Sequence, residues 1–209
     1  VIYQAFNNNA VQVYDYKQNK SRVVYGPNSV KLEPDEMFTL INLSAGVPKE
    51  EGLIKSLKMT LGPDFMKDRV VVETSDHASL TLDLTYIWYF ETDPKFPSKM
   101  FVVKDFIGDT CKSIASRVRG AVSGITFEEF HHHSAQRIRE AVFGVKDGEV
   151  RSELRFEANG LVISSVDITK VNVTDEETRK NLTKSINLAI EIATKNQETN
   201  AKYIAMKID

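Results

Sequence analysis

Histidine most often serves as a metal ligand or an acid–base catalyst near neutral pH, and this chain has four. Three of them are consecutive: His131, His132 and His133. On a helix, consecutive side chains point about 100° apart, so these three cannot converge on one metal ion as an i, i+4 pair can. We interpret the cluster as a solvated helix face and predict no metal site.

The fourth histidine, His77, follows Ser75 and Asp76, which are the residue types of a Ser-His-Asp triad. The G-x-S-x-G turn that exposes a nucleophilic serine is absent, and so are the glycine-rich phosphate-binding motifs and paired cysteines. The single cysteine, Cys111, has the spacing of a buried helix position and is interpreted as a core residue. The sequence therefore predicts no catalytic residue, no cofactor and no enzyme activity.

The basic residues are concentrated at Arg117, Arg119, Arg137 and Arg139. Aromatic residues are not interleaved with them, as they are on surfaces that bind single-stranded nucleic acid. The net charge of −2 also provides no overall basic field. We interpret the arginines as a solvated or intersubunit face paired with Glu and Asp, with RNA binding as a minor alternative. Direct nucleic-acid binding by this chain is not expected.

The first quarter of the chain alternates apolar and polar residues with a period of two, which predicts a small antiparallel β unit. It has few large apolar side chains, so we expect it to lean on a neighbouring domain. The stretch 44–52 combines Gly, Pro and charged residues and is predicted to be a linker. These observations place a first domain at residues 1–52 and a second at 53–173.

The second domain contains the strongest strand pattern in the chain. After strand signals at 54–61 and 70–74, apolar residues alternate at Leu80, Leu82, Leu84, Tyr86, Trp88 and Phe90. The opposite face is polar until Ile87 and Tyr89, which predicts that this end of the strand is covered on both sides. Ile87 and Tyr89 are therefore candidate assembly-interface residues.

Two helices and a strand complete the second domain. Apolar residues recur at spacings of three and four over 107–122, which predicts an amphipathic helix, and a capping box at Thr126–Glu129 opens a second helix that ends at Gly144. The turn Asn159-Gly160 precedes a long strand over 161–173, with a register change near Ser165. Strands, two helices and a strand make the fold class α+β.

Residues 174–209 form the third segment. A capping box at Thr174–Glu177 opens a long run of helix-forming residues without Gly or Pro. The heptad-spaced apolar seam consists of Leu182, Ile186, Ala189 and Ala193. Such a seam is too thin to stabilise a lone helix, so these four are candidate assembly-interface residues that need identical neighbours. Because the chain does not begin with Met and the pattern runs to Asp209, we expect further chain on both sides.

Several long stretches of this sequence resemble the major vault protein family. They are residues 61–65, 73–78, 88–91, 105–109, 111–122 and 159–167. The resemblance covers essentially the whole chain: residues 11–27 are similar to the last β repeat of the family, 53–173 to its shoulder domain and 174 onward to the start of its cap helix. The shoulder is also similar to the band 7 core of stomatin, prohibitin and flotillin.

The resemblance implies a structural shell subunit, many identical copies of which stand side by side in the vault ribonucleoprotein particle. The implied partners are the homo-oligomer itself, vault-associated proteins and RNA in the assembled particle, and a lipid-raft contact through the shoulder. The alternative is a membrane-associated, stomatin-like scaffold. A single cysteine fits a reducing compartment, and the family implies a cytoplasmic location with a minor nuclear fraction.

Overall fold

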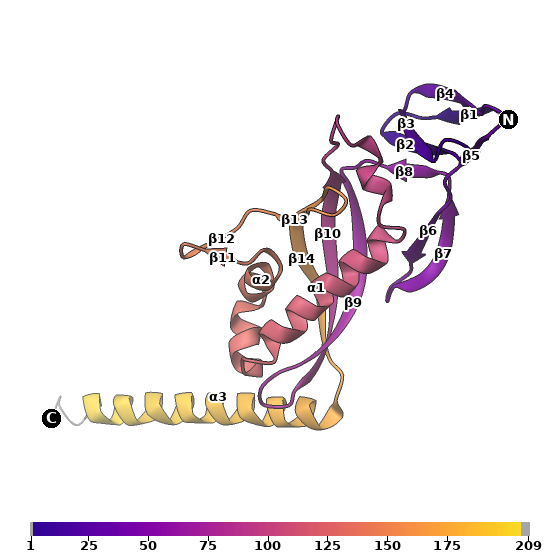
Figure 1. Ribbon diagram of the computed structural model, residues 1–209. Helices are drawn as coiled ribbons and strands as arrows, with labels where there is room; N and C mark the ends of the chain where they lie inside the picture. Colours follow the sequence, from indigo (N-terminus) through magenta and orange to yellow (C-terminus); the bar gives the residue numbers. More distant parts are fainter. Residues whose placement is uncertain (1, 206–209) are drawn as a thin grey trace.

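The computed structural model describes residues 2–205, except the side chains of residues 185, 186, 189, 193 and 197–205 in the last helix. The chain runs from a group of short strands, through a sheet covered by two helices, to a long helix that projects from the body (Figure 1). This order confirms the predicted α+β class.

Residues 2–60 form short strands, as the period-two alternation predicts. They are β1 (Ile2–Ala5), β2 (Asn9–Asp15), β3 (Lys20–Tyr25), β4 (Asn28–Lys31), β5 (Glu36–Phe38), β6 (Ile41–Ala45), β7 (Glu50–Ser56) and β8 (Lys58–Thr60). Strand β2 pairs with β3, β5 and β8, while β1 pairs with β4 and β6 with β7, all antiparallel. Val11 and Val13 of β2 are completely buried, so β2 is the centre of this repeat region.

The segment 44–52 forms the tip of the β6–β7 hairpin, where Ala45 pairs with Glu50. The expectation of a linker here is wrong, because its glycine and proline serve a turn inside a hairpin. Gly46, with φ of +85°, takes the left-handed conformation that such a turn requires. The division of the chain at residue 52 stays a prediction.

The shoulder is built on a four-stranded antiparallel sheet in the order β13–β14–β10–β9. Its strands are β9 (Asp64–Glu73), β10 (Ser79–Phe90), β13 (Leu154–Phe156) and β14 (Leu161–Val173). The six alternating apolar side chains of β10 are 0–6% exposed, which confirms the predicted core face. Ile87 pairs with Ser165 but Trp88 pairs with Ile163, so the predicted register change near Ser165 is also confirmed.

Strand β9 is longer than the predicted segment 70–74. Met66, Asp68, Val70 and Val72 face the core in alternation, and Asp68 is only 6% exposed. A carboxylate at a core position interrupts the apolar pattern, which is why the sequence did not reveal the first half of the strand. The Asp68 carboxylate accepts a hydrogen bond from the backbone N–H of Lys49, at 3.2 Å, in the β6–β7 turn.

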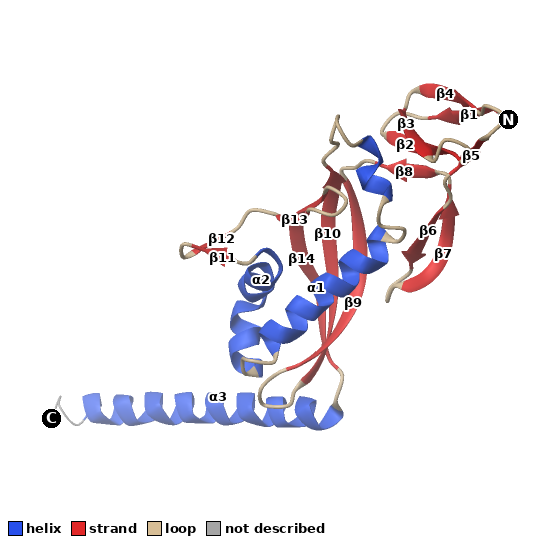
Figure 2. Cartoon of the chain, in the orientation of Figure 1, coloured by secondary structure: helices blue, strands red, loops and turns tan. Residues whose placement is uncertain are grey.

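Helices α1 (Phe106–Val122) and α2 (Phe127–Phe143) cover one face of this sheet (Figure 2). Cys111, Ile114, Val118 and Val122 of α1 are at most 2% exposed, as predicted. The Thr126 hydroxyl accepts a hydrogen bond from the Glu129 N–H at 3.3 Å, as a capping box requires. The smaller elements are the 3-10 helix η1 (Pro97–Phe101) and the hairpin of β11 (Val145–Lys146) and β12 (Glu149–Val150).

The repeat region is fastened to the shoulder by Asp105, the residue before α1. One carboxylate oxygen accepts hydrogen bonds from the N–H groups of Ser44 (2.9 Å) and Gly108 (3.0 Å), and the other accepts from the Ser44 hydroxyl at 2.5 Å. Ser44 is 1% exposed. The same carboxylate therefore caps α1 and holds strand β6 of the repeat region, and the predicted need of that region for a neighbour is met here.

The long helix α3 (Glu176–Ala205) begins one residue later than predicted, because its N-cap is Asp175 and not Thr174. The Asp175 carboxylate, not the Thr174 hydroxyl, accepts the hydrogen bond from the N–H of Thr178, at 3.0 Å. Thr174 still belongs to the sheet: its N–H donates to the Ser79 carbonyl, and its hydroxyl pairs with that of Thr81 at 2.9 Å. The helix cap thus lies where the strand pairing ends.

Candidate assembly interface

The face of the shoulder sheet opposite α1 and α2 is uncovered in this chain, and we call it the open sheet face. Its residues are Phe65, Lys67, Arg69 and Val71 of β9, Thr81, Asp83, Thr85, Ile87 and Tyr89 of β10, and Ser165, Asp167, Lys170 and Asn172 of β14. Three apolar residues are exposed there: Val71 (52%), Ile87 (40%) and Phe65 (61%), of which Ile87 and Phe65 are cross-strand partners. An exposed apolar pair on a sheet face is a typical contact point for another protein surface.

The predicted pair Ile87 and Tyr89 lies on this face, but the two side chains differ. Tyr89 is partly buried, and its hydroxyl donates to the Glu153 carboxylate at 3.2 Å. Loss of solvent, together with that carboxylate, raises the pKa of Tyr89. The structure therefore adds Phe65 as the apolar neighbour of Ile87. The alternation of Phe65, Lys67, Arg69 and Val71 is the sequence signal that identifies it once Asp68 is accepted as a core residue.

The centre of the open sheet face is polar. The guanidinium of Arg69 pairs with the carboxylate of Asp83, with Nε 2.7 Å from Oδ1, and this hydrogen bond lowers the pKa of Asp83. Lys67 lies over the Phe65 ring, 5.9 Å from its centroid. Charged side chains of both signs thus follow the apolar pair along the strands, as polar residues do in the rim of a protein contact.

The predicted seam of α3 is only partly described by the structure. Leu182 is partly buried and packs against the shoulder core, while the side chains of Ile186, Ala189 and Ala193 lie outside the described residues. Three apolar residues that the heptad pattern did not include are well exposed. They are Leu188 (58%), Ile190 (59%) and Ile192 (54%).

These three residues lie on two sides of α3. At about 100° per residue, Ile190 lies about 80° from Leu182 in one direction, and Leu188 and Ile192 lie about 120° and 80° from it in the other. The two sides, which we call the flanks, therefore face almost opposite directions. A single heptad seam, which the sequence predicts, does not include them.

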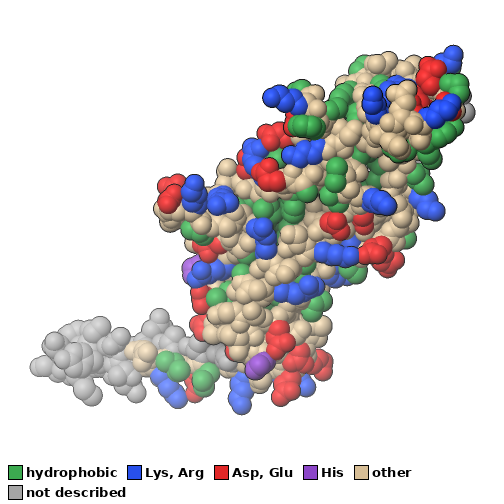
Figure 3. Space-filling model, viewed as in Figure 1, with side chains coloured by type: hydrophobic (Ala, Val, Ile, Leu, Met, Phe, Trp, Pro, Cys, Tyr) green, Lys and Arg blue, Asp and Glu red, His purple; other side chains and the backbone are tan. Residues whose placement is uncertain are grey.

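Two of the four arginines donate hydrogen bonds to backbone carbonyl groups. Arg117 donates to the Val142 carbonyl and Arg119 to the Val71 carbonyl, both at 3.1 Å, whereas Arg137 pairs with the carboxylates of Glu129 and Glu140. The predicted pairing with acidic residues is therefore confirmed for Arg137 only. On the helix-covered side of the shoulder, side chains of both charges are interspersed (Figure 3).

The histidines do not come together. Residues 131–133 are exposed on α2, where the ring of His131 stacks on that of Phe127 and the helix is interrupted at His133. His77 is exposed and lies 2.8 Å from the Glu73 carboxylate. Among the described residues, no group of three His, Cys, Asp or Glu side chains could hold a metal ion.

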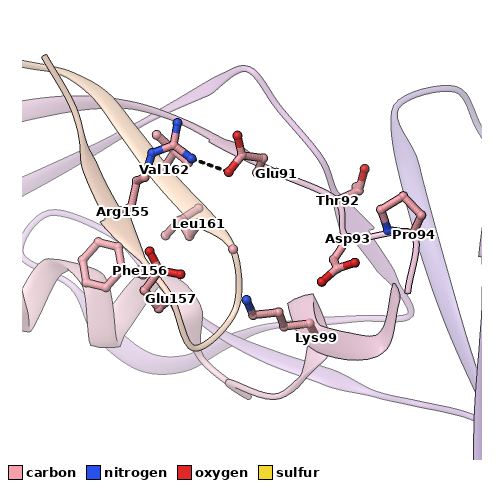
Figure 4. A pocket seen from close by; sticks show the side chains of 11 residues that line it. Glu91, Thr92, Asp93, Pro94, Lys99, Arg155, Phe156, Glu157, Leu161 and Val162 are labelled. Atoms are coloured by element: carbon pink, nitrogen blue, oxygen red, sulfur yellow. Dashed lines mark hydrogen bonds and ion pairs between the residues drawn. The ribbon is translucent and has the colours of Figure 1, made fainter. Parts of the chain in front are cut away.

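A polar hollow lies beside the turn between β13 and β14. Glu91, Asp93, Lys99, Arg155 and Glu157 line it, and Arg155 pairs with Glu91 across it (Figure 4). The lining contains no serine, cysteine or histidine. In the part of the chain that the structure describes, no helix is long and apolar enough to cross a membrane.

Comparison with known proteins assigns both halves of the chain. A family model described as "Shoulder domain" matches residues 62–175, and one described as "Major Vault Protein Repeat domain" matches residues 1–61. The two models meet just after β8, ahead of the first strand of the shoulder sheet.

Curated relatives agree with these models. Major vault protein alpha of Dictyostelium discoideum is 52% identical over all of this chain and 25% of its own length. The major vault protein of Trypanosoma cruzi is 56% identical over 94% of this chain and 24% of its own length, and that of Ictalurus punctatus is 50% identical over all of it and 25% of its own.

The chain spans about a quarter of the length of the curated relatives it matches. These relatives are named as major vault proteins, no catalytic family is indicated, and the alternative of a membrane scaffold finds no support among them. The shoulder model alone covers more than half of the 209 residues, so the chain belongs to the major vault protein family.

Proposed function

We propose that this chain is part of a structural shell subunit that assembles side by side with identical copies into the vault ribonucleoprotein particle. The observation that carries the proposal is the pair of flanks on α3. A helix that packs only on its own domain needs one apolar side, whereas a helix in a ring of identical helices touches one neighbour on each of two sides. Leu188 and Ile192 on one flank, and Ile190 on the other, fit the second arrangement.

Packing between flanks would bury surface that is exposed in the single chain. The three flank residues are each more than half exposed, and burying the remainder contributes about 1 kcal/mol per side chain. A contact between unlike flanks is head to tail, so it repeats from copy to copy until the ring closes. Each subunit then gains the contribution twice, once from each neighbour.

Among the described residues, the side of α3 opposite Leu182 is polar and suits an exposed side of such a ring. Lys180, Asn187 and Glu191 lie about 140–180° from Leu182, on the side away from the shoulder core. All three are exposed. The helix therefore has one polar side and an apolar arc of about 200° that runs from Leu188 through Leu182 to Ile190. Such an arc is about twice as wide as the apolar stripe of about 100° with which a helix packs on its own domain.

The decisive experiment introduces charge on the flanks of the complete protein. We expect Ile190→Asp and Leu188→Asp each to abolish closed particles in negative-stain electron microscopy, and to shift the protein to slowly sedimenting species. Asn187→Asp is the matched control, because it places a carboxylate on the polar side of the same helical turn. Normal particles from both flank variants would contradict the proposal.

A charge exchange tests whether the contact joins unlike flanks. Ile190→Lys and Ile192→Glu should each impair assembly, and the double variant should recover much of it, because lysine on one flank of each copy then meets glutamate on the opposite flank of the next. A contact between like flanks predicts no recovery. The rescue therefore distinguishes a closed ring from a symmetric dimer of helices.

The further partners follow from the family and from the proposed particle. We propose that vault-associated proteins and RNA join the assembled particle without direct nucleic-acid contact by this part of the chain. Co-sedimentation of RNA with intact particles, but not with the Ile190→Asp variant, would support this. We also propose a cytoplasmic location with a minor nuclear fraction, which cell fractionation tests directly.

A further inference from the structure

The open sheet face has no cover within the described chain, although a sheet with exposed apolar residues is normally covered. The exposed fractions are 61% for Phe65, 40% for Ile87 and 52% for Val71. On the other side of the same strands, the alternating partners of these residues are almost completely buried under α1 and α2. The question is which surface covers the open side.

The flanks of α3 indicate the direction in which the covering surface lies. Figure 1 shows the strands of the shoulder sheet side by side, with α1 and α2 in front of them and α3 lying across the view below. Leu182 packs against the shoulder core, so that side of α3 faces the body. Since α3 lies across the view and its Leu182 side points to the body, its two flanks point roughly along the viewing direction, one toward the viewer and one away. These are the directions of the helix layer and of the open sheet face.

We propose that the open sheet face is covered by the outer surface of α1 of the neighbouring copy. A neighbour that touches a flank of α3 is displaced along the normal of the sheet, so its helix layer meets this sheet from behind. The inference rests on the proposed side-by-side assembly and adds the surfaces that meet in the shoulder. Around the ring, the sheet layer of each shoulder then lies between its own helix layer and the helix layer of the next copy.

The outer surface of α1 is suited to lie against strands. Asp109, Ser113, Ser116 and Gly120 lie about 140–200° from the buried Cys111, at about 100° per residue. Three of these four side chains are small, and a Cβ atom added at Gly120 would meet nothing within 4 Å in the chain. Glycine inside a helix costs about 1 kcal/mol relative to alanine, and no contact within this chain requires it here. A flat, small-residue surface allows a neighbouring sheet to approach closely.

The contact between the open sheet face and α1 is too small to hold two copies together without the α3 contact. Three strands of about ten residues present a face about 33 Å long and about 14 Å wide, from ~3.3 Å per residue and ~4.8 Å between strands. This is well below the ~800 Å² per partner of a standard stable interface. The contact alone would not hold a dimer together, but it adds to the α3 contact when both join the same two copies.

Cysteine crosslinking in the complete protein tests the contact. Ile87 and Ser113 lie at similar heights along β10, because Cys111, two residues before Ser113, has its sulfur 3.8 Å from that of Met66, and Met66 pairs with Tyr86, the neighbour of Ile87. The variant carrying both Ile87→Cys and Ser113→Cys is treated with a short bismaleimide. The natural Cys111 is 2% exposed and burial raises its pKa to about 12, so it contributes little thiolate to the reaction.

We expect the double variant to give a ladder of dimers, trimers and longer species, at least tenfold stronger than either single variant gives. The matched control combines Ile87→Cys with Glu149→Cys, an exposed position on the β11–β12 hairpin, and should give no ladder. Dimers from Ile87→Cys alone would overturn the proposal, because they require two open faces to meet. Assembled particles without a ladder would overturn this contact and leave the proposed function intact, whereas a protein that forms no particles would overturn both.

Discussion

The shoulder sheet and helix α3 obtain their stability in opposite ways. The apolar residues of β10 and α1 that face each other are almost completely buried within one chain, whereas the flank residues of α3 are each more than half exposed. The shoulder can therefore be folded and stable as a single copy. Apart from Leu182, which packs against the shoulder core, the described apolar side chains of the helix would gain packing only from neighbours, so in the proposed particle the stability of the helix depends on assembly. The following predictions test this difference.

The largest effect is expected in the shoulder core. Trp88 is 3% exposed and makes edge-on contacts with Phe106 at 5.1 Å and Phe90 at 5.8 Å between ring centroids. Trp88→Ala should lower the free energy of unfolding by about 3–5 kcal/mol in urea melts. Its neighbour on the opposite face supplies the control: Ile87→Ala should cost less than about 1 kcal/mol in the unassembled protein. Equal losses of unfolding free energy for the two variants would show that Ile87 is buried in the unassembled protein.

The next effect concerns the junction between the repeat region and the shoulder. Asp105→Asn should cost about 1–3 kcal/mol, because the charged acceptor of three hydrogen bonds is lost. Loss of solvent would raise the pKa of Asp105, but the hydrogen bonds from Ser44 and Gly108 outweigh it, and the pKa is lowered. The contribution is therefore present above the unfolded pKa of about 3.9, and it is lost as the pH falls through the folded value.

The lowered pKa of Asp105 makes its contribution to stability depend on pH, and this dependence can be measured. In urea melts between about pH 6 and pH 2, the difference between the wild-type protein and Asp105→Asn should be largest near neutral pH and shrink in acid. Asp109→Asn, an exposed change one turn further along α1, is the control and should show a smaller difference. A gap that is the same at every pH would show that the charge of Asp105 does not stabilise the junction.

A smaller effect of opposite sign is expected at Tyr86. Its side chain is completely buried, its hydroxyl has no hydrogen-bond partner among the described residues, and burial raises its pKa. Tyr86→Phe should raise the free energy of unfolding by about 1 kcal/mol, because an unsatisfied polar group leaves the core. Calorimetry or urea melts would measure it. Destabilisation by the same amount would indicate that the hydroxyl is hydrogen-bonded in solution.

The smallest effect is expected on α3. Ile190→Asp should change the unfolding free energy of the unassembled protein by less than about 0.5 kcal/mol, since its side chain contacts mostly solvent in one copy. The urea melt should superimpose on that of Asn187→Asp while particle formation differs completely. A large loss of monomer stability would contradict the contrast between helix and shoulder.

The sequence predicts the shoulder well where one physical rule dominates. The alternation from Leu80 to Phe90 and the spacing of Cys111, Ile114 and Val118 identify the core because nothing else competes with apolar burial there. The first half of β9 is missed because Asp68 occupies a core position, and its partner at Lys49 lies in a turn that only the folded structure brings near. A local pattern cannot reveal an acceptor whose donor comes from elsewhere in the chain.

The assembly surfaces are harder to predict for a different reason. Ile87 was recognisable because it interrupts a polar row, but Phe65 acquires meaning only through its pairing with Ile87 across the sheet. On α3 the heptad pattern includes Leu182, which the chain itself covers in part, but it does not include Ile190 and Ile192. The positions of residues that would contact another copy depend on how the copies pack in the proposed assembly. The periodicity of one helix or strand does not reveal that packing.

The carboxylate of Asp105 has a mechanical consequence for a closed shell. It joins the first turn of α1 to strand β6 through short hydrogen bonds and so fixes the tilt between the repeat region and the shoulder. In a ring of identical subunits, one degree of tilt in each copy changes the radius of the whole shell above the junction. A stiff joint of a few atoms, repeated in every subunit, would thus govern how far the wall can flex without any lateral contact being broken.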